Sequence, residues 1–333
     1  MTSKNIRPPT NQDPRSADPE PAAIRVIVLN FNGGHHVVET VESLRQSQVS
    51  VPIHLRVVDN TSTDGSDSDL ESHFPDLDLH RFGENRGYAG GNNRAIRETN
   101  EPFVLLVNHD VVVDPMTVDR LYLALTSGPD RAAVMPRLLF VDPPGTINLI
   151  GIGLEANGSP RGMGRGCPDG PEFDTPREIF GAHGACVMYR RSAIEEAGLF
   201  DERYFAYNEE FDLAWRLRLL GYTCHYVADA RACHHEAISL RKDPNRLLIL
   251  MERNRIWTLF KNAGIGFLVR NLVPILWQEW AAVRHALGMR TGAPLVARWQ
   301  ALLGLPGILA TRWRVQRSRR VTDQEIESWI GRD

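Results

Sequence analysis

Three acidic side chains lie within four residues, where Glu209, Glu210 and Asp212 begin a predicted helix. The helix dipole favours carboxylates in a first helical turn, so helix capping is one explanation of this cluster. In a cleft, such carboxylates repel one another unless a cation, a salt bridge or a role as a base compensates for their charge. The cluster therefore supplies candidate general bases that could take a proton from a hydroxyl group.

One aspartate and a pair of histidines are candidate metal ligands. Asp110 follows an apolar run, and His234-His235 follow another. Hard divalent ions prefer oxygen ligands, and an aspartate together with a histidine suits Mn²⁺ or Mg²⁺. Successive residues of a strand point to opposite faces, so at most one of the two adjacent histidines can share a site with Asp110. His35-His36 are expected to be structural or solvated.

Several arginines are candidates for phosphate binding, because a guanidinium group matches the oxygens of a phosphate. Arg86, Arg253 and Arg255 are examples, although surface charge explains each of them better when it is taken alone. The glycines of residues 87–91 lack the spacing of a dinucleotide-binding loop, and no strand directly precedes them. This excludes a dehydrogenase of the Rossmann type.

The hydrophobic pattern of the N-terminal third predicts a parallel sheet. Apolar, β-branched runs at 24–29, 53–58 and 103–107 predict strands, and the segments 36–46 and 92–99 between them have helical spacing. Strands that alternate with helices require crossover connections, which place helices on both faces of a mostly parallel sheet. The fold class predicted is therefore α/β.

Polar residues follow each of these three strands. Asn30 and Asn32 follow the first strand, Asp59 closes the second, and Asp110 follows the third. In such sheets ligands bind beyond the carboxyl ends of the strands. We therefore expect one polar cleft at this edge of the sheet, and we expect Asp110 and Glu210 to lie around the same hollow.

The chain of 333 residues (37.4 kDa) divides into three parts. Residues 1–23 are polar and proline-rich and predict a disordered tail. Residues 24–262 contain the sheet and further predicted helices, and residues 263–333 predict a helical, basic extension. Within the second part, residues 141–181 are rich in glycine and proline, which predicts long loops over a site.

Composition indicates a cytoplasmic protein. Hydrophobic residues make up 42% and charged residues 24%, as in an ordinary globular chain. The four cysteines show no CxxC pairing, which disfavours a disulfide scaffold or a zinc ribbon. The first residues contain no apolar signal core, and no uninterrupted apolar stretch is long enough to cross a bilayer.

Charge is distributed unevenly along the chain. Residues 241–320 hold fifteen basic and three acidic residues, whereas residues 1–240 hold 22 basic and 34 acidic ones. Four tryptophans within residues 265–320 of this basic end suit peripheral contact with an anionic membrane. Packing on the preceding domain, or a homodimer, explains it equally well. No nucleic-acid recognition motif accompanies the charge. The tryptophans are Trp277, Trp280, Trp299 and Trp313.

Eight motifs occur in the order VIVLNFN (26–32), VVDNTSTDGS (57–66), ENRGYAGGNN (84–93), LLVNHD (105–110), GAHGACVMYRR (181–191), GLFDERYFAYNEEFDLAWRLRLLGY (198–222), CHHEAIS (233–239) and ERNR (252–255). This series resembles the inverting glycosyltransferases of family 2 with a GT-A fold, in particular their rhamnosyltransferase-like bacterial branch. The resemblance covers about residues 24–262. It implies a GT-A catalytic domain with a Rossmann-like central sheet.

The resemblance also implies roles for individual residues. Asp59 would contact the base of a nucleotide, and Asp110 and His234 would hold Mn²⁺ or Mg²⁺. Glu210 would be the catalytic base, and Arg253 or Arg255 would lie near a diphosphate. Further candidates for nucleotide binding in the same motifs are Asn30, Asn32, Asn85, Arg86, Gly87, Asn93 and Asn108, and Glu209 and Asp212 accompany the base.

Two positions depart from the family pattern. The family has DxD, or Asn-Pro-Asp in this branch, where this chain has Asn108-His109-Asp110. The second acid is kept, so metal binding is still expected. The family base is usually the aspartate of a Glu-Asp pair, whereas this chain has Glu209-Glu210. Glu210 is longer by one methylene group, and Asp212 is an alternative base.

The expected reaction moves a sugar from a nucleotide-diphosphate donor to an acceptor hydroxyl with inversion. A divalent ion and arginines would stabilise the charge that develops on the leaving group. The resemblance favours dTDP-rhamnose, with UDP- and GDP-sugars as alternatives. The acceptor would be a saccharide, a lipid-linked saccharide or a small molecule.

Two other functions are alternatives to glycosyl transfer. A sugar-phosphate nucleotidyltransferase needs a glycine-rich basic loop after its first strand, and this chain has residues 30–36 (NFNGGHH) there instead. A catalytically degenerate subunit that binds sugar nucleotides or assists assembly is the non-enzymatic alternative, because of the departures at Asn108 and Glu210.

Overall fold

The computed structural model describes residues 22–236, 243–289 and 291–332. Its centre is a sheet with the strand order β10-β12-β6-β11-β4-β1-β2-β3, to which β5 and β7 add at the side; β8 and β9 form a separate hairpin. The predicted tail of residues 1–23 lies almost wholly outside the described residues. The strands are β1 (Ile24–Asn30), β2 (Ile53–Asp59), β3 (Asp78–Arg81), β4 (Phe103–Asn108), β5 (Val111–Val113), β6 (Arg131–Phe140), β7 (Ile147–Leu149), β8 (Gly151–Leu154), β9 (Pro160–Met163), β10 (Arg177–Ile179), β11 (Cys186–Arg190) and β12 (Thr223–His234).

The predicted parallel strands are confirmed. Strand β1 lies between β2 and β4 and pairs with both in parallel, and its apolar side chains are almost fully buried. Asn30 lies opposite Asp59, and Leu29 lies opposite Asn108, so the three strands end at the same edge. Strand β11 then pairs antiparallel with β4, which begins a mixed second half of the sheet.

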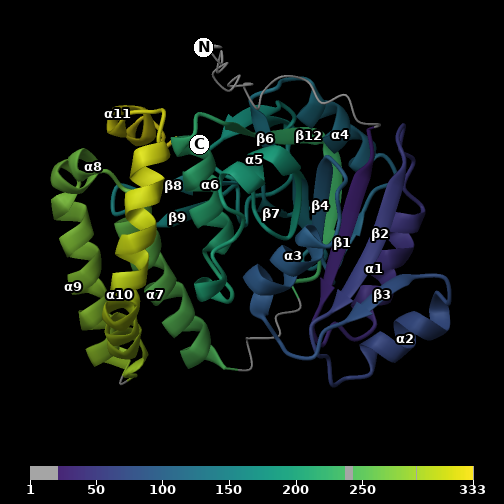
Figure 1. Cartoon of the computed structure of the whole chain (residues 1–333), viewed down its shortest axis with the longest axis horizontal. Coiled ribbons are helices and arrows are strands. Elements are labelled where there is room, and N and C mark those ends of the chain that lie inside the picture. The colour runs from purple at the N-terminus through teal and green to yellow at the C-terminus, as the bar shows by residue number, and fades with distance from the viewer. Residues whose placement is uncertain (1–21, 237–242, 290, 333) are drawn as a thin grey trace, which may run out of the picture.

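Helices surround this sheet, and the last four lie together at one end of the molecule, away from β2 and β3 (Figure 1). The predicted fold class, an α/β protein with a C-terminal helical region, is confirmed. The helices are α1 (His36–Arg45), α2 (Ser66–His73), α3 (Gly87–Arg97), α4 (Thr117–Thr126), α5 (Arg191–Glu196), α6 (Glu209–Leu219), α7 (Pro244–Asn262), α8 (Ile265–Arg270), α9 (Leu272–Met289), α10 (Ala293–Ser318) and α11 (Asp323–Glu327), with 3₁₀ turns η1 (Pro171–Phe173) and η2 (Glu202–Tyr204).

Two predictions about local structure need correction. The segment 141–181 is not loop throughout, because β7 to β10 lie within it and bury apolar residues such as Ile147 and Ile179. The prolines of the C-terminal region, Pro274, Pro294 and Pro306, predict breaks between its helical segments, but α10 continues through Pro306. Pro294 lies at the start of α10, where a missing N–H costs nothing.

The C-terminal extension shares a hydrophobic core with the rest of the chain. Trp215 of α6, Leu259 of α7, Phe267 of α8 and Val315 of α10 belong to one buried cluster, which also includes Ile326. A segment with its own core would bury its apolar residues internally. The extension therefore packs on the catalytic region as a structural layer, which was one of the predicted alternatives.

Candidate active site

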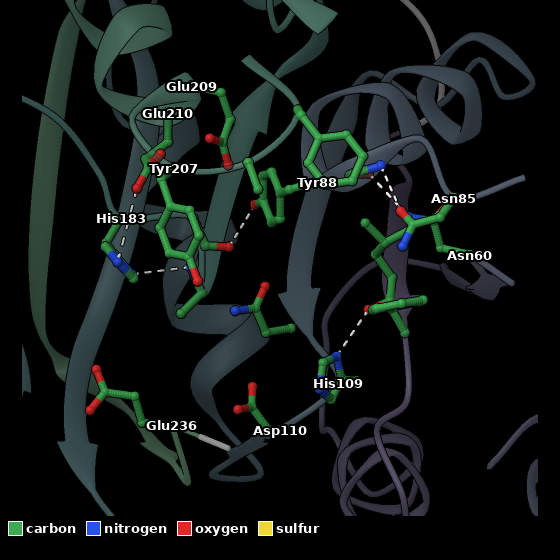
Figure 2. Close-up of a pocket in the computed structure, with 18 of the residues that line it drawn as sticks. Asn60, Asn85, Tyr88, His109, Asp110, His183, Tyr207, Glu209, Glu210 and Glu236 are labelled. Carbon is green, nitrogen blue, oxygen red and sulfur yellow. Dashed lines mark hydrogen bonds and ion pairs between the residues drawn. The ribbon is translucent and has the colours of Figure 1, made fainter. Parts of the chain in front are cut away.

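A cavity of about 310 Å³ opens at the edge where the parallel strands end (Figure 2). It is closed on the other side by the loop before α6 and by the first turn of that helix. Asp110 and Glu210 both line it, so the predicted common hollow exists. The residues around it come from the sheet edge, from the loop before α6 and from α3, α6 and α7: Leu29, Phe31, Asn60, Asn85, Gly87, Tyr88, Asn108, His109, Asp110, His183, Gly184, Ala185, Phe205, Ala206, Tyr207, Glu209, Glu210, His234, Glu236 and Arg246.

Strand pairing brings Asp110 and His234 together. A tight turn after β4 leads into β5, and Val111 of β5 lies opposite His234 of β12. The imidazole Nε2 of His234 is consequently 3.3 Å from a carboxylate oxygen of Asp110, and both side chains are buried. The adjacent His235 turns away and contacts Glu39 of α1. This agrees with the expectation that the two histidines face different sites.

Glu209 and Glu210 form a buried acidic pair at the start of α6. One carboxylate oxygen of each has no hydrogen-bond partner among the described residues. Burial raises the pKa of both carboxyls, and the nearby Glu210 charge raises that of Glu209 further. His183 Nε2 lies 4.0 Å from Glu210, and burial lowers the pKa of this imidazole to about 3. The arrangement holds a carboxylate of raised basicity at the cavity wall.

Backbone strain marks the loop that carries the acidic pair into place. Phe205, Tyr207 and Asn208 all have positive φ angles, which non-glycine residues rarely adopt. The buried Asn254 of α7 stabilises this conformation, because its side-chain amide donates hydrogen bonds to three carbonyls of the loop. Those carbonyls belong to Tyr204, Ala206 and Tyr207.

The opposite wall of the cavity is fixed by Asn60, which follows β2. Its amide nitrogen donates to Asn85 and to the carbonyl of Gly87, and its oxygen accepts from the Arg86 N–H. Gly87 must be glycine, because its φ is +66° and a Cβ atom would lie 2.2 Å from the carbonyl oxygen of Phe205. The two walls therefore touch at this residue.

Comparison with known proteins places the chain in a family. The model of glycosyl transferase family 2 matches residues 25–198. The N-acetylglucosaminyl-diphospho-decaprenol L-rhamnosyltransferase of Mycobacterium tuberculosis is 30% identical over 247 residues, which cover 66% of this chain and 78% of that protein. The chain belongs to glycosyl transferase family 2. It is therefore a glycosyltransferase, as its motifs predict.

Other relatives of this family 2 glycosyltransferase agree. The low-salt glycan biosynthesis hexosyltransferase Agl10 of Haloferax volcanii is 26% identical over 278 residues, covering 78% of this chain and 84% of Agl10. Among solved structures, S. aureus TarS 1–349 in complex with UDP-GlcNAc superposes with a TM-score of 0.55 at 15% identity, covering 92% and 89% of the two chains. GalNAc-T7 with UDP, GalNAc and Mn²⁺ gives 0.58 at 13% identity, covering 73% and 48%. These likenesses confirm the GT-A fold.

About half of the predicted site residues of this glycosyltransferase line the cavity. They are Asn85, Gly87, Asn108, Asp110, Glu209, Glu210 and His234. The structure thus brings the candidate metal ligands, the candidate bases and part of the third motif to one place.

Five other predicted residues do not line the cavity and instead make hydrogen bonds within the protein. The Asp59 carboxylate accepts hydrogen bonds from the Asn30 amide and from a backbone N–H of the following loop. Asn32 accepts a hydrogen bond from that same loop. Arg86 pairs with Glu84, and Asn93 binds the backbone of Phe200. None of these five predicted side chains lines the cavity.

Three predicted residues lie elsewhere. Asp212 is fully buried and paired with Arg216 and Lys261, at 2.7 and 2.8 Å. Burial would raise its pKa, but these two cations outweigh burial and lower it. The structure does not support Asp212 as an alternative base, because its carboxylate is enclosed and paired with two cations.

The two arginines of the ERNR motif also do not reach the cavity. Arg255 is buried against Glu279, and Arg253 donates to the carbonyl of Tyr204 and stacks on Trp257. Their predicted place beside a diphosphate is not supported by the structure. Arg246, about two turns before Arg253 in α7, lines the cavity instead.

Sequence reasoning missed His183, Tyr207, Arg246 and Asn254. His183 and Tyr207 lie within quoted motifs, but nothing in their type or spacing assigned them a role. Asn254 lies between the two arginines that were selected for their charge. A buried asparagine that clamps a strained loop leaves no periodic or electrostatic signal in a sequence.

We expect Gly87→Ala to lower transfer about 10²-fold, because the added methyl group displaces the Phe205 carbonyl and shifts the cavity wall by a fraction of an ångström or more. Steady-state rates measure this. Gly83→Ala is the matched control, since a Cβ atom there meets nothing within 4 Å. Equal rates in both variants would contradict the close approach.

Proposed function

We propose that this glycosyltransferase moves rhamnose from dTDP-rhamnose to a hydroxyl of a lipid-linked saccharide, with inversion at the anomeric carbon. The L-rhamnosyltransferase of M. tuberculosis, 30% identical over 66% of the chain, supports the sugar and the lipid-diphosphate acceptor. The buried, partly unpartnered carboxylate of Glu210 in the cavity wall is the observation that carries the mechanism.

Glu210 is the proposed general base. Its side chain is 15% exposed and lies near His183, whereas Glu209 is only 4% exposed. A base must meet the acceptor hydroxyl, so the more accessible carboxylate is the better candidate. Glu210 would take the proton of that hydroxyl as the oxygen attacks the anomeric carbon and the nucleoside diphosphate leaves from the opposite face. A single displacement of this kind inverts the anomeric centre.

Asp110 and His234 would hold a divalent ion, Mn²⁺ or Mg²⁺. Their ligand atoms are 3.3 Å apart, which is close to the separation of two ligands that each lie about 2.1 Å from one ion. Both side chains are buried at the cavity wall, so a cation would also compensate for the carboxylate charge. When bound, the ion supplies Lewis-acid stabilisation of the diphosphate.

The donor would lie between the sheet edge and α7. Asn85 presents an amide group and Phe31 an aromatic ring to the part of the cavity beyond the ends of β1 and β2, which suits a nucleotide base. Asp59 would act there by holding the loop after β2. Arg246, at the first turn of α7, supplies the cationic group for the diphosphate.

The exposed face of the C-terminal extension is the proposed membrane contact. Val273 and Trp277 of α9 are 77% and 65% exposed, and Trp299 and Leu303 of α10 are 63% and 65% exposed. Among the described residues, α10 is also the one helix long and apolar enough to span a membrane by length and composition alone. An apolar face of this extent needs a covering in water.

Charge favours an anionic leaflet as that covering. Arg284 lies over the ring of Trp280, and Arg317 lies over that of Trp313. Tryptophan beside arginine is typical of the interface between acyl chains and phosphate headgroups. We therefore propose that the enzyme lies peripherally on the inner face of the cell membrane, where a lipid-linked acceptor is presented. A second copy of the chain is the competing occupant.

Glu210→Gln is expected to lower the transfer rate at least about 10²-fold, because the amide cannot accept the hydroxyl proton. Donor binding should persist, since Gln keeps the size of the side chain. Release of nucleoside diphosphate measures transfer, and thermal stabilisation by dTDP-rhamnose with Mn²⁺ measures binding.

Glu71→Gln, on the exposed face of α2, is the control and should behave as wild type. Near-normal turnover of the Glu210 variant would remove the base assignment. If UDP-GlcNAc or GDP-mannose stabilises the protein and dTDP-rhamnose does not, the proposed donor is wrong, but the assignment of Glu210 as the base is unaffected. If no donor and acceptor pair yields nucleoside diphosphate, the degenerate-subunit alternative gains the support.

The acid limb of the pH–rate profile should lie above pH 4.5, the ordinary value for glutamate. Burial raises the pKa of Glu210, so the carboxyl is protonated and inactive below that pKa and becomes an active base as the pH rises through it. Measurements of kcat/KM against pH test this. Glu210→Asp should retain such a limb, and Glu210→Gln should lose it. A limb at or below pH 4.5 would contradict the assignment.

Trp277→Glu combined with Leu303→Glu should weaken binding to phosphatidylglycerol vesicles at least about tenfold, because each change removes about 1.5–3 kcal/mol of apolar burial. Flotation measures the bound fraction, and phosphatidylcholine vesicles test the role of charge. Leu123→Glu, at an exposed leucine of α4, is the matched control. Unchanged flotation of the double variant, or a stable dimer that does not float, would exclude the membrane contact.

A further inference from the structure

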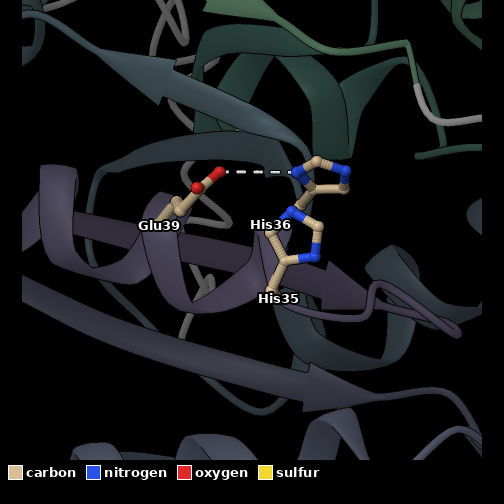
Figure 3. Close-up of side chains that lie close together, drawn as sticks. All are labelled: His35, His36 and Glu39. Atoms are coloured by element: carbon tan, nitrogen blue, oxygen red, sulfur yellow. Dashed lines mark hydrogen bonds and ion pairs between the residues drawn. The ribbon is translucent and has the colours of Figure 1, made fainter.

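Three histidines and a glutamate gather beside the active site, on the far side of the end of β12. His35 and His36 lie at the start of α1, and Glu39 follows one turn later (Figure 3). The ligand atoms of these three lie within 4.8 Å of one another. His235 follows β12 and is not a member of that group, but it lies next to it, with its ring 4.2 Å from that of His36. Two segments separated by about 200 residues thus supply three imidazoles and one carboxylate.

The spacing suits a tetrahedral metal ion better than ion pairs. One Glu39 oxygen is 3.4 Å from His36 Nδ1 and 3.3 Å from His235 Nε2. A charged hydrogen bond is typically about 2.7–2.9 Å long. Ligands about 2.0–2.1 Å from a zinc ion at tetrahedral angles are about 3.3–3.4 Å apart. The distances from the Glu39 oxygen to His36 Nδ1 and to His235 Nε2 both match this separation between two zinc ligands.

The side chain of His35 has no other structural role in the described chain. It precedes α1 but makes no capping hydrogen bond to it. Its ring lies 4.0 Å from that of His36. His35 and Glu39 are exposed, so an ion can enter from solvent. The His35 imidazole lies against that of His36, and in its neutral form one ring nitrogen offers a lone pair to a metal.

This group is distinct from the pair formed by Asp110 and His234. Adjacent residues at the end of β12 point in opposite directions, His234 to the cavity and His235 to α1. Their chemistry differs as well. Three nitrogens and one oxygen suit Zn²⁺, whereas Mn²⁺ and Mg²⁺ prefer sites richer in oxygen.

We propose that His35, His36, Glu39 and His235 bind one Zn²⁺ ion. The ion would link the start of α1 to the end of β12. Because the backbone N–H of His235 donates to the carbonyl of Asp110, this link would also hold the neighbouring active-site residues in place. The role is structural and positioning, and it does not depend on which sugar the enzyme transfers.

The test uses full-length protein without a polyhistidine tag, treated with a chelator and then dialysed. Calorimetric titration with Zn²⁺ should show one tight equivalent, and Co²⁺ should give the intense visible absorption of a tetrahedral site. His36→Ala and Glu39→Gln should each weaken Zn²⁺ binding at least about tenfold, since even an outer-shell partner is worth that much. Zn²⁺ should raise the melting temperature of wild type more than that of either variant.

Two further variants separate this site from others. Asp110→Asn should keep the tight equivalent, because it alters only the cavity pair. His73→Ala, an exposed histidine of α2 bonded to a backbone carbonyl, should also bind as wild type. The proposal is overturned if Zn²⁺ binding is absent, if it survives His36→Ala unchanged, if it is lost with Asp110→Asn, or if the Co²⁺ spectrum is octahedral.

Discussion

The geometry of the active site depends on the ion pairs that the buried carboxylate of Asp212 makes with two neighbouring cations. It pairs with Arg216 of its own helix and with Lys261 of α7, and Asn262 donates to it as well. Removing one partner from such a network leaves an uncompensated buried charge, which costs about 3–5 kcal/mol. The network therefore fixes the rotation and height of α6 against α7, and with them the direction in which Glu210 points.

That anchoring makes the strained and charged features of the site tolerable. Each positive φ of the loop before α6 costs about 1–3 kcal/mol, and the buried Glu209 and Glu210 pair repel each other when both are ionised. Asn254 holds the loop, and the ion pairs of Asp212 hold the helix. Stability elsewhere in the fold thus maintains a carboxylate of raised pKa at the cavity wall, which is a property that a general base requires.

The C-terminal extension also helps to hold α6 in place, and its outer face is exposed to solvent. Its inner face shares a core with α6 and α7 through Phe267 and Val315, so it contributes to the rigidity of the acidic helix. Its outer face exposes tryptophans and leucines to solvent. A layer that both braces α6 and presents an apolar, basic face would couple the orientation of the cavity to any surface bound by that face.

The sequence by itself determined the parallel strands, their shared polar edge, the family and the acidic cluster, because period-2 and helical patterns and ordered motifs are local properties. Only the tertiary structure decided which acid faces the cavity. Glu210 and Asp212 are two residues apart, hence about 200° apart around the helix, and packing alone selects the rotation. It likewise placed Arg246 rather than Arg253 at the cavity, and it brought His36 next to His235. Such choices depend on contacts between distant segments, for which no local pattern exists.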